Sequence, residues 1–186
     1  MTGAHDSERV TVELYVRSLG PRAGIDRQER AVERLDALAA KGALAAFSVS
    51  VWGRRVSLST TTARTDAGQS VLERVDAFRA WAEDAGRSVE SFFETQRVTS
   101  ELADREYAAL VLPALTLSEY RDGDLAFVAP SSDGGSVCTV ADRIDHLAAD
   151  LSASEDGAAD AARPEAEEEP GAVARGPARG AGTLTR

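Results

Sequence analysis

The stretch from Val10 to Trp52 restricts the fold most, because the periodicity of its apolar residues changes twice. From Val10 to Arg17 every second residue is apolar, which is the period of a half-buried β-strand. From Ile25 to Ala39 the apolar residues recur at helical intervals, and charged residues fill the opposite face. Alternation returns from Phe47 to Val51. A strand, a helix and a strand in this order predict a right-handed crossover between two parallel strands.

The rest of the chain carries signals for two more helices and several strands. Thr65-Asp66 offers capping oxygens to a second helix, which Gly86 ends. The apolar run from Tyr107 to Leu112 predicts a strand buried on both faces. The Asp122-Gly123 turn predicts a hairpin, and Thr139 caps a last helix. We therefore predict an α/β (α+β) fold with a mixed sheet of four to six strands and about three main helices.

Composition divides the chain into three parts. Residues 1–9 are polar and predict a disordered start, whereas residues 10–151 predict a single α/β domain. Residues 152–186 consist mainly of Ala, Glu, Gly, Asp, Pro and Arg. Such a segment cannot bury enough apolar surface to offset the entropy lost on ordering, so it predicts a disordered acidic tail.

The charge balance is unusual. The formal net charge is −10, and Lys41 is the only lysine beside 20 arginines. An acidic surface with so little lysine fits a salt-adapted or GC-rich proteome, in which solvated carboxylates keep a protein soluble. Negative charge is then weak evidence against a nucleic-acid partner. High salt screens the repulsion, although it also weakens every phosphate contact.

Cysteine content and hydropathy bear on location. Cys138 is the only cysteine, so no disulfide can form within the chain, and its side chain is expected to be a small buried hydrophobe. No apolar run approaches the ~18 to 20 residues that a membrane helix needs. We expect a cytoplasmic protein without a membrane contact.

Residues that could carry chemistry are few. His5 and His146 stand alone, without the HExxH or CxxC patterns that mark metal sites. The loop from Ser131 to Gly135 lacks the lysine of a phosphate-binding loop and favours an ordinary turn. Asp122 and Asp124 could hold a cation, but a hairpin turn explains both of them. The sequence predicts no catalytic residue, no metal site and no cofactor, so we expect a protein that is not an enzyme.

One segment combines features of a DNA-binding unit. The first helix ends before Gly42, a strand follows, Arg54 and Arg55 stand at its turn, and Thr65-Asp66-Ala67-Gly68 opens the next helix. This order resembles winged helix-turn-helix proteins, in which a recognition helix precedes a two-stranded wing. The resemblance implies a winged-helix-like segment at residues 25–85. Arg54 and Arg55 are then either wing contacts to phosphate or residues of a solvated turn.

A second resemblance covers the whole domain, roughly residues 10 to 151. Its motifs are Val12-Glu13-Leu14-Tyr15-Val16-Arg17-Ser18-Leu19, Val51-Trp52-Gly53, Thr65-Asp66-Ala67-Gly68, Phe92-Phe93-Glu94, Leu110-Val111-Leu112-Pro113 and Glu119-Tyr120-Arg121-Asp122-Gly123. Through these residues the chain resembles a haloarchaeal family of helix-turn-helix (HTH) domain proteins without established function. The resemblance implies an archaeal cytoplasmic origin and a regulatory role, and it assigns no site residue.

These observations favour a non-catalytic regulator that contacts DNA. The wing-like turn would contribute Arg54 and Arg55. The exposed face of the first helix would add three further arginines, Arg27, Arg30 and Arg34.

The alternative is a ligand-sensing or protein-interaction module without DNA binding. Val89 to Val98 predicts a strand in which the adjacent Phe92 and Phe93 point to opposite faces. Together with Trp52 and Tyr120 these aromatic residues would flank an apolar sheet face. A partner protein, a ligand or a second copy of the chain would cover that face.

Overall fold

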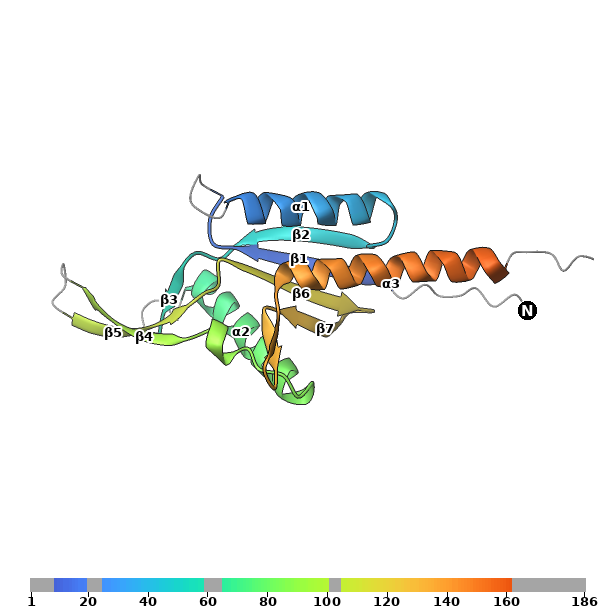
Figure 1. Cartoon of the computed structure of the whole chain (residues 1–186). Helices are drawn as coiled ribbons and strands as arrows, with labels where there is room; N and C mark the ends of the chain where they lie inside the picture. Colours follow the sequence, from blue (N-terminus) through green and yellow to red (C-terminus); the bar gives the residue numbers. More distant parts are fainter. Residues whose placement is uncertain (1–8, 20–24, 59–64, 101–104, 162–186) are drawn as a thin grey trace, which may run out of the picture.

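The computed structural model describes residues 9–19, 25–58, 65–100 and 105–161 (Figure 1). Its elements are three α-helices, one 3₁₀ turn and nine strands within those ranges. In chain order they are β1 (Val10–Val16), α1 (Ile25–Ala40), β2 (Ala46–Val51), β3 (Arg55–Ser57), α2 (Asp66–Asp84), η1 (Glu90–Phe92), β4 (Thr95–Ser100), β5 (Arg105–Val111), β6 (Leu115–Arg121), β7 (Asp124–Ala129), β8 (Ser131–Asp133), β9 (Ser136–Cys138) and α3 (Val140–Ala161).

The larger sheet has four strands in the order β2-β1-β6-β7. β1 and β2 are parallel, with Val12 beside Phe47, and α1 connects them, so the predicted strand-helix-strand unit is confirmed. β6 and β7 add antiparallel neighbours, which makes the sheet mixed. The predicted α+β fold with three main helices is confirmed.

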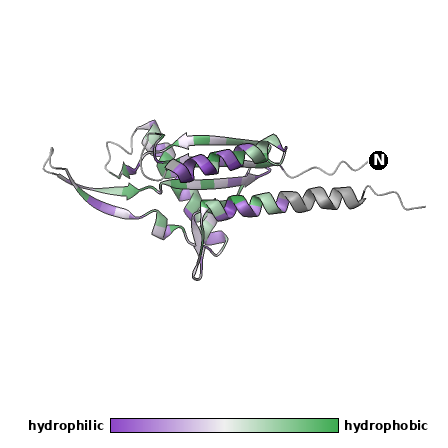
Figure 2. Cartoon of the chain, turned by 45° about the horizontal axis from the view of Figure 1, so that its top comes forward, coloured by the Kyte–Doolittle hydropathy of each residue, from purple (hydrophilic) through white to green (hydrophobic). Residues whose placement is uncertain are grey.

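Helices cover both faces of this sheet. The alternation in β1 directs Val12 and Leu14 into a core with α1 and α3, to which Leu35 and Ile144 contribute buried side chains. α1 and α3 contact each other on this face, and Figure 2 shows mostly hydrophilic residues along the length of α1. The amphipathic pattern of α1 is therefore explained by packing of its apolar stripe on the sheet.

A second core lies beneath α2. Val75 and Phe78 of this helix are fully buried against the opposite face of the sheet. Tyr15 stacks on Trp52 there with ring centroids 4.9 Å apart, and Trp52 meets Phe93 edge to face. Aromatic pairs of this kind stabilise a core beyond the area that they bury.

A smaller sheet has the order β3-β5-β4. β4 and β5 form a two-stranded ribbon that projects from the rest of the molecule, as Figures 1 and 2 show. β8 and β9 form a separate short hairpin, so the predicted Ser131 to Gly135 loop is a strand pair closed by a Gly134-Gly135 turn.

The two-stranded wing at residues 25–85 is not formed. β2 pairs with β1 in the four-stranded sheet, whereas β3 pairs with β5 in the three-stranded sheet. The two strands that the sequence places at one turn therefore belong to different sheets. Each strand pairs with a segment that is distant in the sequence, β2 with β1 and β3 with β5. The sequence around Arg54 does not indicate either pairing.

The predicted aromatic sheet face is also wrong. Trp52 is 8% exposed and Phe93 1% exposed, because α2 packs over both rings. The segment from Val89 to Val98 forms η1 and then β4 instead of one strand. Because Phe92 lies in the 3₁₀ turn, Phe92 and Phe93 do not have to point to opposite faces as they would in a strand. Phe92 is half-buried and packs against the same core.

Several local predictions hold. Thr65 caps α2, where its hydroxyl accepts a hydrogen bond from the Gly68 amide at 3.1 Å. Asp122 and Gly123, with φ of 52° and 99°, make the turn between β6 and β7. α3 begins after Thr139 but continues to Ala161, beyond the expected end of order at Leu151.

Candidate nucleic-acid interface

The candidate interface lies where the two sheets meet. Because β1 and β2 are parallel, their carboxyl ends reach the same edge of the larger sheet. The chain leaves β2 there and turns at Gly53, whose φ of 84° suits glycine, to enter β3. The return from β5 to β6 passes the same point, and the Leu112 amide donates to the Arg54 carbonyl at 3.0 Å. The backbone of Arg54 is thereby held between the sheets.

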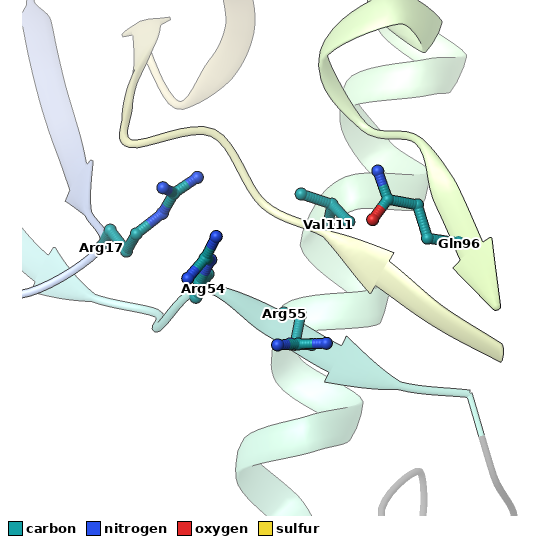
Figure 3. Close-up of a pocket in the computed structure, with 5 residues that line it drawn as sticks. All are labelled: Arg17, Arg54, Arg55, Gln96 and Val111. Carbon is teal, nitrogen blue, oxygen red and sulfur yellow. The ribbon is translucent and has the colours of Figure 1, made fainter. Parts of the chain in front are cut away.

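Three arginines converge at this junction. Arg17, Arg54 and Arg55 line a cavity of about 180 Å³ together with Gln96 and Val111 (Figure 3). Arg17 follows β1, Arg54 precedes β3, and Arg55 begins β3. The predicted pair Arg54 and Arg55 is therefore part of one hollow. Arg17 could not be predicted from the sequence as a member of this site, because the contacts that position it come from residues far along the chain.

Arg17 is held by the β5–β6 connection. One of its Nη atoms donates to the Leu112 carbonyl at 2.7 Å, and its backbone amide donates to the Ala114 carbonyl at 3.1 Å. Its Nε atom is buried and has no hydrogen-bond partner among the described residues. The Arg17 guanidinium is thus fixed at the cavity wall before any ligand arrives.

The charge at this cavity is unbalanced. Six other arginines of the described part are in ion pairs with carboxylates, namely Arg34, Arg74, Arg79, Arg87, Arg121 and Arg143. Within the same part of the chain no carboxylate lies within ion-pair distance of Arg17, Arg54 or Arg55. Like charges held together repel, so an anion in this cavity would gain electrostatic energy from all three.

The arginines predicted on the first helix lie elsewhere. Arg27, Arg30 and Arg34 recur at helical spacing on α1, and none of them lines the cavity. Arg27 and Arg30 are exposed, whereas Arg34 is in an ion pair with Asp145 of α3. α1 begins at the edge of the sheet where β1 ends, so its first turn is on the same side of the molecule as the cavity.

The remaining candidate groups show no arrangement for catalysis. Among the described residues no three His, Cys, Asp or Glu side chains are grouped as a metal site. His146 is exposed on α3. Cys138 is half-buried, and burial raises the pKa of its thiol, which disfavours the reactive thiolate. Burial and the hydrogen bond to Glu13 likewise raise the pKa of Tyr15.

Comparison with protein families gives a match that covers most of the chain. A family described as "Helix-turn-helix domain" matches residues 4–152. The chain belongs to this helix-turn-helix domain family. Membership indicates a DNA-binding, regulatory role in general terms and points to a non-enzymatic protein. No curated protein and no solved structure matches the chain.

The helix-turn-helix domain family name does not by itself locate the DNA contact. α1 and α2 are separated by β2 and β3, so the described residues contain no two consecutive α-helices joined by a short turn. None of the described helices is long and apolar enough to cross a membrane.

Proposed function

We propose that this helix-turn-helix domain protein is a non-catalytic transcription regulator of a haloarchaeon that binds DNA through Arg54 and Arg55. Arg27 and Arg30 of α1 extend the contact to neighbouring phosphates. Arg34 belongs to the same proposed contact, although it must exchange its ion pair with Asp145 for a phosphate. The family match supports DNA binding in general, and the residue assignment is our own.

The observation that supports Arg54 and Arg55 as DNA contacts is the cavity in which their positive charge is not compensated by a carboxylate of the described residues. In a chain of net charge −10, three guanidiniums with no carboxylate of the described residues at ion-pair distance reverse the sign of the charge locally. Guanidinium groups present several donors in a plane and bind phosphate oxygens in pairs. A phosphate of the DNA backbone supplies the missing counter-charge.

The test is retention of a labelled mixed-sequence duplex as potassium chloride is raised from low to molar concentration. Each phosphate contact contributes about −0.9 to the slope of log affinity against log salt. The Arg54→Ala, Arg55→Ala double variant should bind more weakly and lose about two units of that slope.

A double variant with the same change in net charge serves as the control. Arg9 precedes β1 and Lys41 follows α1, so both lie at the opposite edge of the larger sheet, and both are exposed. The Arg9→Ala, Lys41→Ala variant should keep the wild-type slope. Absence of retention of the wild type at every salt concentration would contradict the proposed function.

A further inference from the structure

The two faces of the β3-β5-β4 sheet have different roles. Val56 of β3 and Leu110 of β5 are buried in the core beneath α2. These two residues pair directly, and Thr95 of β4 is opposite Leu110. Since side chains alternate along a strand, their neighbours point to the other face.

That other face contains the arginine cavity. Arg55 pairs with Val111, and both line the cavity with Gln96 of β4. Figure 3 shows the Gln96 amide on the far side of Val111 from Arg17 and Arg54. Two residues further out along the ribbon, Val98 pairs with Tyr107, and both are partly exposed. One continuous face therefore runs from the arginines toward the far end of the ribbon.

Shape and charge favour one occupant for this face. The ribbon projects beyond the helices, as Figure 1 shows, so a DNA duplex can approach it without meeting them. The major groove of B-DNA is about 12 Å wide and admits a two-stranded ribbon. A ribbon lying in the groove brings its base, where the arginines are, to the sugar-phosphate backbone at the groove edge.

We propose that the DNA contact of this protein is made by the β4–β5 ribbon, through the face that carries Gln96 and Val98, with one backbone phosphate seated between Arg17, Arg54 and Arg55. This inference rests on the proposed function and specifies its geometry. Duplex DNA is the ligand, and the ribbon, not α1, is the principal contact.

The cavity dimensions agree with a single phosphate. A volume of about 180 Å³ accommodates one phosphate group. A neighbouring hollow is lined by Arg17 together with Glu94 and Leu112. The Glu94 carboxylate repels phosphate from that hollow, which leaves the side of Arg54, Arg55 and Gln96 as the favourable position.

Adjacent residues on opposite faces provide the test. Gln96→Glu and Thr95→Glu each add one negative charge to β4, one on the cavity face and one on the face toward α2. In the duplex-retention measurement, Gln96→Glu should weaken binding at least about tenfold, because like charges placed in contact at an interface are strongly unfavourable. Thr95→Glu should stay within about twofold of the wild type, because its added charge is solvated and screened.

A second variant extends the test along the ribbon. Val98→Glu adds a charge on the same face as Gln96, further from the cavity, and should also weaken binding. Thermal unfolding of each variant confirms that the domain is folded before binding is compared.

The outcomes separate the two proposals. Suppose that the wild type is retained and the Arg54→Ala, Arg55→Ala variant is not. If Gln96→Glu and Val98→Glu then bind as tightly as the wild type, the ribbon contact is overturned, whereas the proposed function still stands. Equal weakening by Thr95→Glu and Gln96→Glu also overturns the ribbon contact, because the effect would then be independent of the face. Absence of wild-type binding at all salt concentrations overturns the proposed function.

Discussion

Glu119 is the one acidic side chain in the described residues that is fully buried. Its carboxylate accepts hydrogen bonds from Arg121 at 2.8 Å and from Arg143 Nε at 2.7 Å, and a second nitrogen of Arg143 is in an ion pair with it at 2.5 Å. The Arg143 guanidinium lies 4.2 Å from the Phe127 ring centroid. A buried carboxylate is costly unless it is paired and hydrogen-bonded. This group therefore fixes α3 on β6 in one register.

Replacement of this carboxylate should be strongly destabilising. Glu119→Gln keeps the volume but leaves two guanidiniums around a neutral amide, so we expect the free energy of unfolding to fall by about 3 kcal/mol. Arg121→Gln should cost less, because Arg121 is 32% exposed and Arg143 still pairs with the Glu119 carboxylate. Denaturant unfolding in molar potassium chloride measures both, and equal effects of the two variants would contradict this account.

At the scale of an element, the amino end of α3 is closed by reciprocal hydrogen bonds. The Thr139 amide and hydroxyl donate to the Asp142 carboxylate at 2.9 and 2.7 Å, and the Asp142 amide donates to the Thr139 hydroxyl at 3.3 Å. This is a capping box with aspartate in the third position. The Thr139 hydroxyl and amide hold the pKa of Asp142 below its ordinary value.

The pH dependence of this cap follows from the direction of that shift. A lowered pKa in the folded state contributes stability above the unfolded-state value, about 3.9, and the contribution is lost as pH falls through the folded-state pKa. Thr139→Ala removes the hydroxyl donor, so the pKa of Asp142 should rise toward its ordinary value. NMR titration of the Asp142 carboxyl measures the change. Thr65→Ala, at the cap of α2, is the control and should leave it unaltered.

Elements with a local cause were predictable from the sequence. The parallel β1–β2 pair follows from two alternating strands around an amphipathic helix, and the turn at Asp122-Gly123 follows from residues that tolerate positive φ. The pairing of β3 with β5 has no local cause, since Val56 and Leu110 meet only in the folded chain. The predicted wing is wrong for this reason, because adjacency in the sequence does not determine which strands pair.

The residues of the candidate site likewise include some that were predictable from the sequence and one that was not. Arg54 and Arg55 were predictable because two adjacent arginines at a turn are visible in the sequence. Arg17 was not, because the carbonyl of Leu112 positions it. The arginines of α1 were predicted from helical spacing alone, and spacing cannot indicate that Asp145 engages Arg34.

At the scale of the whole molecule, the first turns of α3 contribute buried side chains to the core. Val140, Ile144 and Leu147 pack in the core with α1. We predict that a chain ending at Leu151 keeps its melting temperature in molar salt within the few degrees that correspond to about 1 kcal/mol. A larger fall, measured by thermal unfolding beside the full chain, would show that residues after Leu151 stabilise the domain.

The truncated chain should also keep its acidic character. Residues 152–186 contain seven acidic and four basic residues of the 31 and 21 in the chain, so the remainder has 24 against 17 and a net charge of −7. The solubility that acidic groups provide in concentrated salt is therefore a property of the domain itself.

The central position of β1 also determines when the molecule can fold. β1 lies between β2 and β6, and its first residue, Val10, pairs with Arg121. During synthesis β1, α1 and β2 leave the ribosome long before β6. Until β6 has been made, one edge of β1 has no strand to pair with. Contacts between such distant segments slow folding. The arginine cavity cannot form before Leu112 has been made, since Leu112 contacts both Arg17 and Arg54, so a nascent chain lacks this cavity until most of the domain has been synthesised.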